Sequence, residues 1–447
     1  MIRRVIQIEE DKCNGCGACA KACHEGAIGM VNGKAKLMRD DYCDGLGDCL
    51  PACPMDAIHF IEREAEAYDE AAVLKNKEEK AKAERSRLRQ WPVQIKLLPV
   101  HAPFYEGANL LIAADCTAYA YAKFHDEFLK NRVVLVGCPK LDSTDYAVKL
   151  AEIIRQNNIG FVVALGGGSP MDCAKAAASV ALTQDSIRKY HGTGVALPAE
   201  HLPLIAIPTT AGTGSEVTCV SVLSDHANGK KAPIVSEGFY PAAAIIDPEL
   251  TYTMPPAVTA GTGIDVLSHA IEGYWSKGHQ PICDTLAIHA AALVFKYLYR
   301  AYENPSDEEA REKMCEASVI AGLAFTLPKT TSSHACSFPL TNIYHIPHGE
   351  ACGLTLDYFV RINARGTGSE RVETLAKALG FADAEALADA IFALKQKLGL
   401  RCDLKDLHLE EEQIAELVKI SRHPNLYNNP VEITDEMLDK MYRYLAN

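Results

Sequence analysis

The stretch FVVALGGGSPMDCAK, residues 161–175, decides the fold of most of this chain. It begins with an apolar run of strand length, passes through three glycines and a serine, and ends in a segment of helical composition. Glycines let the backbone approach a phosphate closely, and the N-terminus of the following helix offers free N–H groups and a positive dipole end. The triplet alone is equally consistent with a plain strand-to-helix turn.

The sequence on both sides of this stretch alternates between strand-like and helix-like segments. Before it, three apolar runs have strand length and one segment has helical spacing. The runs are VQIKLLPV (93–100), NLLIAADC (109–116) and VVLVGCPK (133–140), and the helical segment is DYAVKLAEIIRQNN (145–158). After it, IPTTAGTGSEVT (207–218) is a second strand-to-loop transition, crowded with hydroxyls and glycines. The alternation predicts a parallel sheet with both faces covered.

Two segments further along carry side chains suited to a metal ion. In GTGIDVLSHAIEGY (261–274), Asp265 and His269 are four residues apart on a predicted helix and share a face. SSHACSFPLTNIYHIPHGEACGL (332–354) supplies His334 and His348. One carboxylate and three imidazoles suit a divalent transition metal with an open position for substrate, although a single histidine is more often a core or surface residue than a ligand.

In this order the motifs resemble the iron-containing (group III) alcohol dehydrogenase family, over about residues 160–447. The resemblance implies an α/β dinucleotide-binding domain, an all-helical metal-binding domain, and an active site in the cleft between them. It implies Fe(II) or Zn bound by the catalytic side chains Asp265, His269, His334 and His348. The implied NAD(P)-binding residues are Gly166, Gly167, Gly168, Ser169 and Asp172 at the pyrophosphate, Thr209, Thr210, Thr213 and Gly214 at the ribose and nicotinamide, and Lys231 near the cofactor.

The resemblance also implies a reaction, the interconversion of an alcohol and an aldehyde or ketone. The metal binds the substrate oxygen and hydride moves between the substrate carbon and the nicotinamide. One position departs from the family: a second histidine, often found four residues after the one matching His334, is Phe338 here. The proton then needs another route, for which His345 or water is the candidate.

The first sixty residues contain a cysteine-rich internal duplication. DKCNGCGACAKACHEGAI (11–28) and DYCDGLGDCLPACPMDAI (41–58) match at a constant offset, and we expect each copy to form a short strand, a cysteine loop and a short helix. The first copy has the spacing C-x2-C-x2-C-x3-C, and the second has Leu46 in place of its second cysteine. This pattern favours a two-cluster ferredoxin, with a zinc knuckle as the alternative.

In two-cluster ferredoxins the fourth cysteine of each run ligates the other cluster. A [4Fe-4S] cluster would therefore be held by Cys13, Cys16, Cys19 and Cys53. The second site keeps only Cys23, Cys43 and Cys49, because a leucine cannot bind iron. We expect a [3Fe-4S] cluster or a labile [4Fe-4S] cluster at this second site.

Residues 1–158 resemble small bacterial ferredoxin-domain proteins that end in an α/β unit, which predicts a fusion joined near residues 157–161. Asp115, at the end of LLIAAD, could then act as the acidic residue that binds the adenosine ribose; the alternative is an incomplete dinucleotide domain. The expected domains are a ferredoxin-type module (1–61), a charged helical linker (62–90), an α/β dinucleotide-binding domain (91–255) and an all-helical metal-binding domain (256–447).

The amino-acid composition limits the expected partners and location of this protein. The net charge of −13 argues against a nucleic-acid partner, and we find neither a signal peptide nor a membrane span. Sixteen cysteines without export predict a reducing, cytoplasmic location. We therefore expect a homo-oligomeric oxidoreductase for a small alcohol or aldehyde, with an iron–sulfur module for electron transfer or for docking a redox protein. The alternative is an electron-transfer protein whose dehydrogenase half is weak or inactive. The sequence carries no flavin signature to couple the clusters to hydride chemistry.

Overall fold

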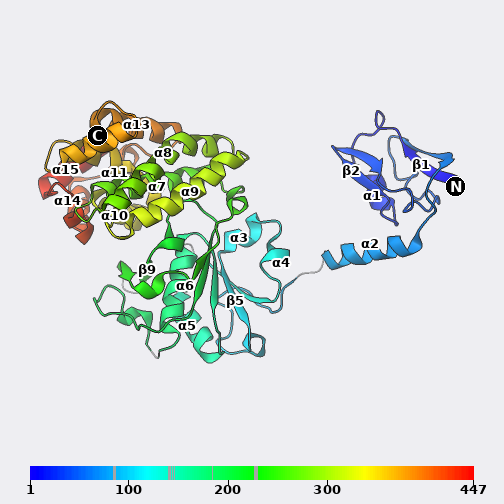
Figure 1. The fold of residues 1–447 in the computed structure, drawn as a ribbon, viewed down its shortest axis with the longest axis horizontal. Helices are drawn as coiled ribbons and strands as arrows, with labels where there is room; N and C mark the ends of the chain where they lie inside the picture. Colours follow the sequence, from blue (N-terminus) through cyan, green and yellow to red (C-terminus); the bar gives the residue numbers. More distant parts are fainter. Residues whose placement is uncertain (84–86, 139–141, 143, 145, 184, 226–229) are drawn as a thin grey trace. The chain divides into compact units, whose positions relative to one another are not determined.

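The computed structural model describes residues 1–447 apart from 84–86, 139–141, 143, 145, 184 and 226–229. The chain forms two compact units, Met1–Arg87 and Leu88–Asn447 (Figure 1). Each unit has its own buried core, so each is described by itself.

The first unit is built on two antiparallel strand pairs. Strand β1 (Ile2–Ile8) pairs with β4 (Ile58–Glu64), and β2 (Ile28–Val31) pairs with β3 (Lys34–Leu37). Helix α1 (Ala18–Ala22) follows the first cysteine loop. The corresponding residues of the second copy form turns in the described structure, so the expected second helix is wrong. Its sequence has Pro51 where the first copy has Lys21, and proline lacks the N–H that a helix interior needs.

The predicted linker is partly a piece of the first unit. Its first residues complete β4, and helix α2 (Glu70–Ala83) begins against the module. Val73 is 1% exposed in the module core, and the Lys77 ammonium lies 2.8 Å from the Glu25 carboxylate. The start of α2 is therefore docked on the module and is not a solvated arm.

The second unit begins with a five-stranded parallel sheet of order β11-β8-β7-β5-β6. Its strands are β5 (Asn109–Ala113), β6 (Arg132–Val136), β7 (Val162–Gly166), β8 (Leu204–Pro208) and β11 (Ala243–Ala244). The predicted parallel sheet is confirmed. The run 93–100 is not a strand: apart from one bridge at Gln94 it forms turns, and it buries Ile95 and Leu98 at a spacing of three.

Side chains that alternate along the strands bury both faces of this sheet, as its period of two requires. Leu110, Ile112 and Ala164 pack with helices α5 (Tyr146–Gln156) and α6 (Gly168–Val180). Leu111 and Leu165 pack with α4 (Phe124–Glu127), which follows α3 (Asp115–Ala120) on the other face (Figure 1). An antiparallel hairpin of β9 (Val220–Asp225) and β10 (Lys230–Val235) contacts α6.

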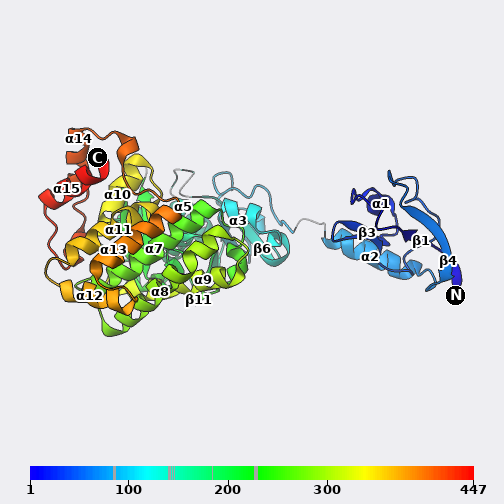
Figure 2. The same ribbon diagram turned by 90° about the horizontal axis from the view of Figure 1, so that it is seen from above.

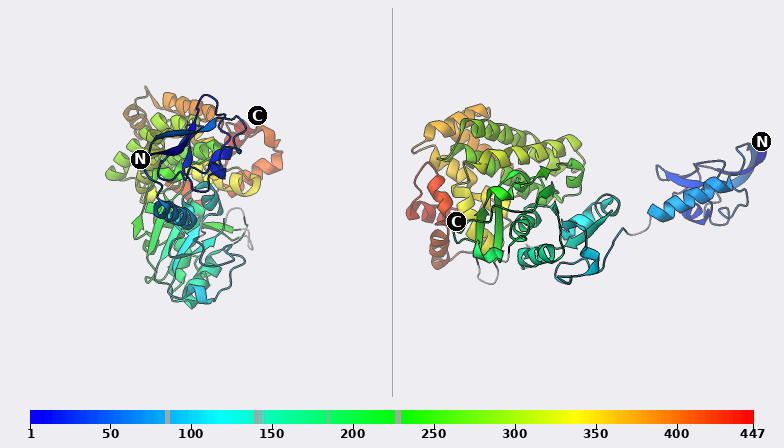
Figure 3. Two further views of the ribbon diagram at one scale, coloured as in Figure 1. Left: turned by 90° about the vertical axis from the view of Figure 1, so that its right-hand side faces the viewer. Right: turned by 60° about the horizontal axis from the view of Figure 1, so that its bottom comes forward.

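Only helices, some of them 3₁₀, follow Pro256 among the described residues. They are α7 (Pro256–Trp275), α8 (Pro281–Glu303), α9 (Glu308–Thr326), α10 (Ser332–Tyr344), α11 (His348–Asn363), α12 (Ser369–Ala378), α13 (Ala384–Lys397), α14 (Glu411–Ile420) and α15 (Asp435–Ala446). They share one apolar core, in which α7 contacts α8, α9 and α11 (Figures 2 and 3).

One described helix, α8, is long and apolar enough by composition to cross a membrane. Its buried residues, among them Ala290, Val294 and Leu298, pack in this shared core against α7 and α9. The core helix of a globular domain passes the same test, so α8 is weak evidence for a membrane.

Candidate active site

Helix α7 supplies the first two predicted metal ligands on one turn. Asp265 and His269 are 3% and 6% exposed, and His269 Nε2 lies 4.0 Å from Asp265 Oδ1. The His269 ring stacks on Phe325 of α9, with centroids 4.2 Å apart. The expected common face of Asp265 and His269 is thus present, and it is turned into the protein.

The other two predicted ligands come from neighbouring helices. His334, near the start of α10, places Nε2 at 3.5 Å from Asp265 Oδ1. Its ring centroid lies 4.6 Å from that of His269 and 5.6 Å from that of His348, the first residue of α11. The four side chains therefore converge in one place.

Glycines let α11 approach α7 closely enough for this convergence. A Cβ added to Gly349 would lie 1.9 Å from the carbonyl oxygen of Gly261 and 2.9 Å from Asp265 Cβ. One turn on, a Cβ on Gly353 would lie 2.6 Å from Ile264. Because neither position has room for a side chain, the backbones touch and His348 is brought beside Asp265.

Glu272 is a functional side chain that the sequence reasoning missed. It is fully buried on α7, one turn after His269, and its carboxylate accepts hydrogen bonds from His334 Nδ1 and from the backbone N–H of Ser333 (2.6 Å). Thr331 Oγ1 donates to it as well (2.8 Å). A carboxylate on one ring nitrogen fixes the tautomer and turns the other nitrogen toward a metal.

Unpaired buried atoms show that the cluster fits a cation. Asp265 Oδ1 and His334 Nε2 are buried, lie 3.5 Å apart and have no hydrogen-bond partner in the described structure, so the position between them suits an ion. Burial acts to raise the pKa of Asp265, but the field of His269, His334 and His348 outweighs it and keeps that pKa below its usual range. Burial lowers the pKa of His269 to about 4. An ionised carboxylate beside a neutral imidazole is the state that binds a metal.

The predicted cofactor loops meet beside this cluster. The Thr209 N–H donates to the Gly166 carbonyl (3.0 Å), and added Cβ atoms on Gly167 and Gly168 would contact Thr210 and Thr213. The threonine loop in turn packs on the helical domain, because Cβ atoms on Gly212 and Gly214 would lie 2.6 Å from Thr262 of α7 and Gly322 of α9. The N-terminus of α6, with Ser169 in its first turn, points its free N–H groups into this region.

The predicted side chains of Asp172 and Asp115 lie near the loops. The Asp172 carboxylate accepts hydrogen bonds from Ser215 Oγ (2.7 Å) and the Val222 N–H (3.0 Å), which makes it a tie between α6 and the neighbouring segment. Asp115 begins α3 directly after β5, and its neighbour Ala114 would meet a Cβ on Gly166 at 3.0 Å. Lys231 lies in β10, but its side chain is outside the described residues.

The cysteines of the first unit gather in the crossed arrangement. Burial raises the pKa of Cys19, and the neighbouring thiols of Cys53 and Cys13 add to it. Burial likewise raises the pKa of Cys49 to about 11, and the thiols of Cys23, Cys43 and Cys19 add to it. The last cysteine of each copy is thus close to a thiol of the other copy.

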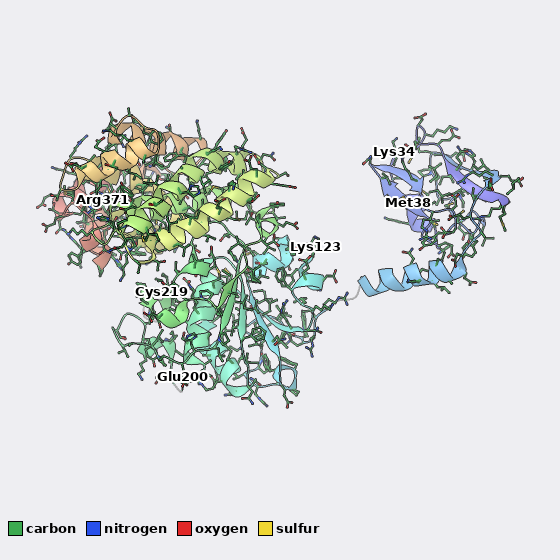
Figure 4. All side chains as sticks on the ribbon, viewed as in Figure 1. Lys34, Met38, Lys123, Glu200, Cys219 and Arg371 are labelled. Atoms are coloured by element: carbon green, nitrogen blue, oxygen red, sulfur yellow. The ribbon has the colours of Figure 1, made fainter. Side chains whose placement is uncertain are left out.

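A backbone N–H group contacts the last cysteine of each copy in the same way. Cys23 Sγ and Cys53 Sγ each accept a 3.3 Å hydrogen bond from the N–H four residues on. Lys34, labelled in Figure 4, donates to the Cys13 carbonyl and ties the β2–β3 hairpin to the first loop. A cavity beside the second group is lined by Cys23, Cys43 and Cys49, and Leu46 is 72% exposed nearby in the same loop.

Three family models match these parts. Iron-containing alcohol dehydrogenase matches residues 104–248, the Fe-containing alcohol dehydrogenase family C-terminal model matches 259–446, and a 4Fe-4S binding domain matches 5–28. The chain belongs to the iron-containing alcohol dehydrogenase family. It is an enzyme of that type with an N-terminal 4Fe-4S binding domain, which confirms the predicted fusion.

Several relatives are similar over the second unit. Alcohol dehydrogenase 4 of Schizosaccharomyces pombe is 35% identical over 296 residues, 65% of this chain and 70% of that protein. NAD-dependent methanol dehydrogenase of Bacillus methanolicus is 36% identical over 276 residues, 60% and 72% of the two chains. A crystal structure of sulfoacetaldehyde reductase from Bifidobacterium kashiwanohense in complex with NAD+ is 62% identical, with a TM-score of 0.71, covering 76% of this chain and 92% of that one.

The dehydrogenase match changes one predicted boundary. It begins at residue 104, so the α/β segment 104–158, which we attributed to the ferredoxin-type protein, belongs to the dehydrogenase match. That segment contributes β5 and β6 to the same sheet as β7. The proposed incomplete dinucleotide domain is therefore not supported, since the fold covers 92% of a chain solved with NAD+.

Proposed function

We propose that this protein reduces a short aldehyde to its alcohol with NADH at a metal held by Asp265, His269, His334 and His348. The observation that carries the proposal is the convergence of these side chains, with Asp265 Oδ1 and His334 Nε2 buried and 3.5 Å apart, beside the glycine and threonine loops. A divalent iron or zinc ion there would polarise the carbonyl oxygen, and NADH would supply the hydride.

The residues around this metal position would bind the cofactor and orient the metal ligands. Gly166, Gly167 and Gly168 let Pro170 and the threonine loop pack closely around the N-terminus of α6, where the helix dipole favours the negative charge of a pyrophosphate. Asp115, at the carboxyl end of the adjacent strand, is placed to bind the adenosine ribose hydroxyls, which favours NAD over NADP. Glu272 keeps Nε2 of His334 turned toward Asp265.

The 62% identical relative supports sulfoacetaldehyde, a two-carbon aldehyde with a sulfonate, as the substrate. A sulfonate needs a hydrogen-bond donor away from the metal. His423 lies beyond Phe338, with ring centroids 4.6 Å apart, and its Nδ1 accepts from the Asn425 N–H. A neutral His423 ring therefore carries its proton on Nε2, where it can donate to the sulfonate.

The test is NADH consumption by anaerobic, iron-loaded protein with sulfoacetaldehyde and, separately, with propanal. We expect turnover of sulfoacetaldehyde, and loss of both metal and turnover in Asp265→Asn. Turnover of propanal but not of sulfoacetaldehyde would support the aldehyde-reducing activity and refute a sulfonate substrate. Turnover that survives in metal-free Asp265→Asn would refute the metal site.

For the first unit we propose a [4Fe-4S] cluster on Cys13, Cys16, Cys19 and Cys53, and a three-iron or labile four-iron cluster on Cys23, Cys43 and Cys49. The crossed grouping of the thiols and the cavity at the second group support this assignment. EPR with iron and sulfide analysis of anaerobic protein tests it. Two four-iron clusters that are equally stable to oxidation, or zinc in place of iron, would refute it.

A second candidate function is electron transfer or docking of a redox protein by a chain whose dehydrogenase half does not turn over. Phe338, at the position where the family often has histidine, favours it. The complete Asp/His set disfavours it. Zero turnover with every aldehyde, together with reversible reduction of the clusters, would leave this function in place of the first.

A further inference from the structure

A cysteine stands among the predicted metal ligands. Cys352 lies one turn after His348 on α11, so the two share a helix face. It is fully buried, and its Sγ is 3.8 Å from His348 Nε2. One donor atom from each of Asp265, His334, His348 and Cys352 falls within 4.8 Å of all the others. The family resemblance does not include this sulfur.

The surroundings of Cys352 differ from those of an ordinary core cysteine. Cys336 is equally buried on α10, but its hydrogen-bonding neighbours are the hydroxyls of Tyr442 and Ser421, and Glu272 and Cys352 act on it only as charges. Cys352 instead lies beside His334, Asp265 and the Ser337 hydroxyl, and the buried Nε2 of His334 is 3.5 Å from the buried Oδ1 of Asp265. A cation between these two atoms would take both as ligands, and a sulfur at the same point becomes a third donor to it.

We infer that Cys352 binds the active-site metal through its sulfur, as an addition to the predicted Asp/His set. This inference rests on the proposed metal site. Binding would release the thiol proton to solvent, since only the thiolate is a strong ligand. A soft sulfur donor shifts the preference of the site toward iron, cobalt and zinc and away from magnesium and manganese.

The decisive experiment replaces the active-site metal with cobalt(II) in the full chain, after the N-terminal clusters have been reconstituted with iron. A cobalt–thiolate bond produces an intense charge-transfer absorption in the near ultraviolet that oxygen and nitrogen ligands do not. We expect this band in the wild-type protein and in Cys336→Ser, which removes an equally buried thiol. We expect its loss in Cys352→Ser, with one equivalent of cobalt still bound.

The same samples give a second readout at the cobalt X-ray absorption edge. A cobalt–sulfur distance of about 2.3 Å, the value for zinc–thiolate bonds, is expected in the wild type and absent in Cys352→Ser. The inference is overturned if the charge-transfer band is unchanged in Cys352→Ser, or if the X-ray absorption spectrum of the wild type shows no cobalt–sulfur distance. If the variant fails to fold, the wild-type X-ray absorption spectrum decides the question. Asp265→Asn, which should bind no cobalt at this site, tests the proposed metal site separately.

Discussion

At the scale of single residues, Glu272 shows how a histidine becomes a ligand. Its carboxylate is fully buried, and it accepts from the His334 ring and from the backbone at the start of α10. It therefore fixes the position of α10 as well as the tautomer of the imidazole. His289 and Glu316 form a comparable but exposed pair at 3.5 Å, with no link to the cluster.

Replacing this carboxylate should weaken the metal site. For Glu272→Gln we expect metal affinity to fall by roughly 10- to 100-fold, because a neutral amide holds the imidazole less firmly and lowers its basicity. Competition with a chromophoric chelator measures the affinity. Glu316→Gln is the matched control and should bind metal as the wild type does. Equal affinity in all three proteins would show that Glu272 has no positioning role.

Phe338 stands where a proton-transfer histidine was expected. Its ring is nearly parallel to that of His348, with centroids 6.2 Å apart, and also contacts His423. His345, the other candidate for a proton route, is an exposed left-handed C-cap of α10. Apart from the predicted ligand His348, the imidazole in contact with Phe338 is His423.

Restoring a histidine here tests the relay. For Phe338→His we expect a change in turnover or in its pH profile, up to the roughly 10²-fold that a positioned acid–base group supplies, at constant metal content. Steady-state rates between acid and alkaline pH, with metal analysis of each sample, measure this. Identical kinetics would show that the position is not a relay site.

At the scale of elements, parallel strands place the cofactor residues at one sheet edge. The carboxyl ends of β5, β7 and β8 carry Asp115, the glycine loop and the threonine loop. Ligands of open α/β sheets bind at this edge because the strands end there and helix N-termini begin. The sheet order therefore decides which loops meet.

Asp115 should set the choice between the two nicotinamide cofactors. A carboxylate accepts hydrogen bonds from a ribose diol and repels a 2′-phosphate, so in Asp115→Ser we expect the preference for NADH over NADPH to fall at least tenfold, about 1.4 kcal/mol. The ratio of kcat/KM values measures it. Asp126→Ser, an exposed acid on α4, should leave the ratio unchanged. A ratio unmoved in Asp115→Ser would place the ribose elsewhere.

The contact between α7 and α11 depends on glycine. For Gly349→Ala we expect about 1–3 kcal/mol of destabilisation and weaker metal binding, because the methyl would strike the backbone carbonyl of Gly261, which cannot rotate away. Gly261→Ala on the facing helix is the control, since an added Cβ there meets nothing within 4 Å. Denaturant unfolding measures both. Equal stabilities would mean that the helices can separate at no cost.

At the scale of the whole molecule, two kinds of redox chemistry share one chain. Clusters transfer single electrons and nicotinamide transfers a hydride, and coupling them ordinarily requires a flavin. Each unit also buries its own core. We therefore expect the clusters to serve docking, electron transfer to a partner, or oxygen sensing.

Loss of the first cluster should spare the dehydrogenase. In folded Cys13→Ser protein we expect NADH-dependent aldehyde reduction within about twofold of the wild type, while cluster iron and sulfide fall, since the catalytic residues all lie in the second unit. Rates are compared with circular dichroism and metal analysis of the same sample. Loss of turnover with a normal content of active-site metal would show that the dehydrogenase depends on the first unit, either for electron transfer or for its fold.

The spacing of residues within single elements allowed much of the structure of this protein to be predicted from the sequence. Asp265 and His269 share a face because four residues make about one helical turn, and the glycines after β7 require a strand-to-helix turn. Cysteine spacing likewise identified the iron–sulfur module. The local errors came from weaker signals: 93–100 forms turns with a spacing of three, and Pro51 prevents the second short helix.

Tertiary structure alone decided which side chains meet. Nothing in the spacing of α7, α10 and α11 shows that Glu272 accepts from His334 or that Cys352 joins the donors, because both depend on how closely glycines let the helices pack. Within one element, covalent geometry fixes the neighbours of a residue. Between elements, packing brings together residues far apart in the chain, and only the folded core determines their distance.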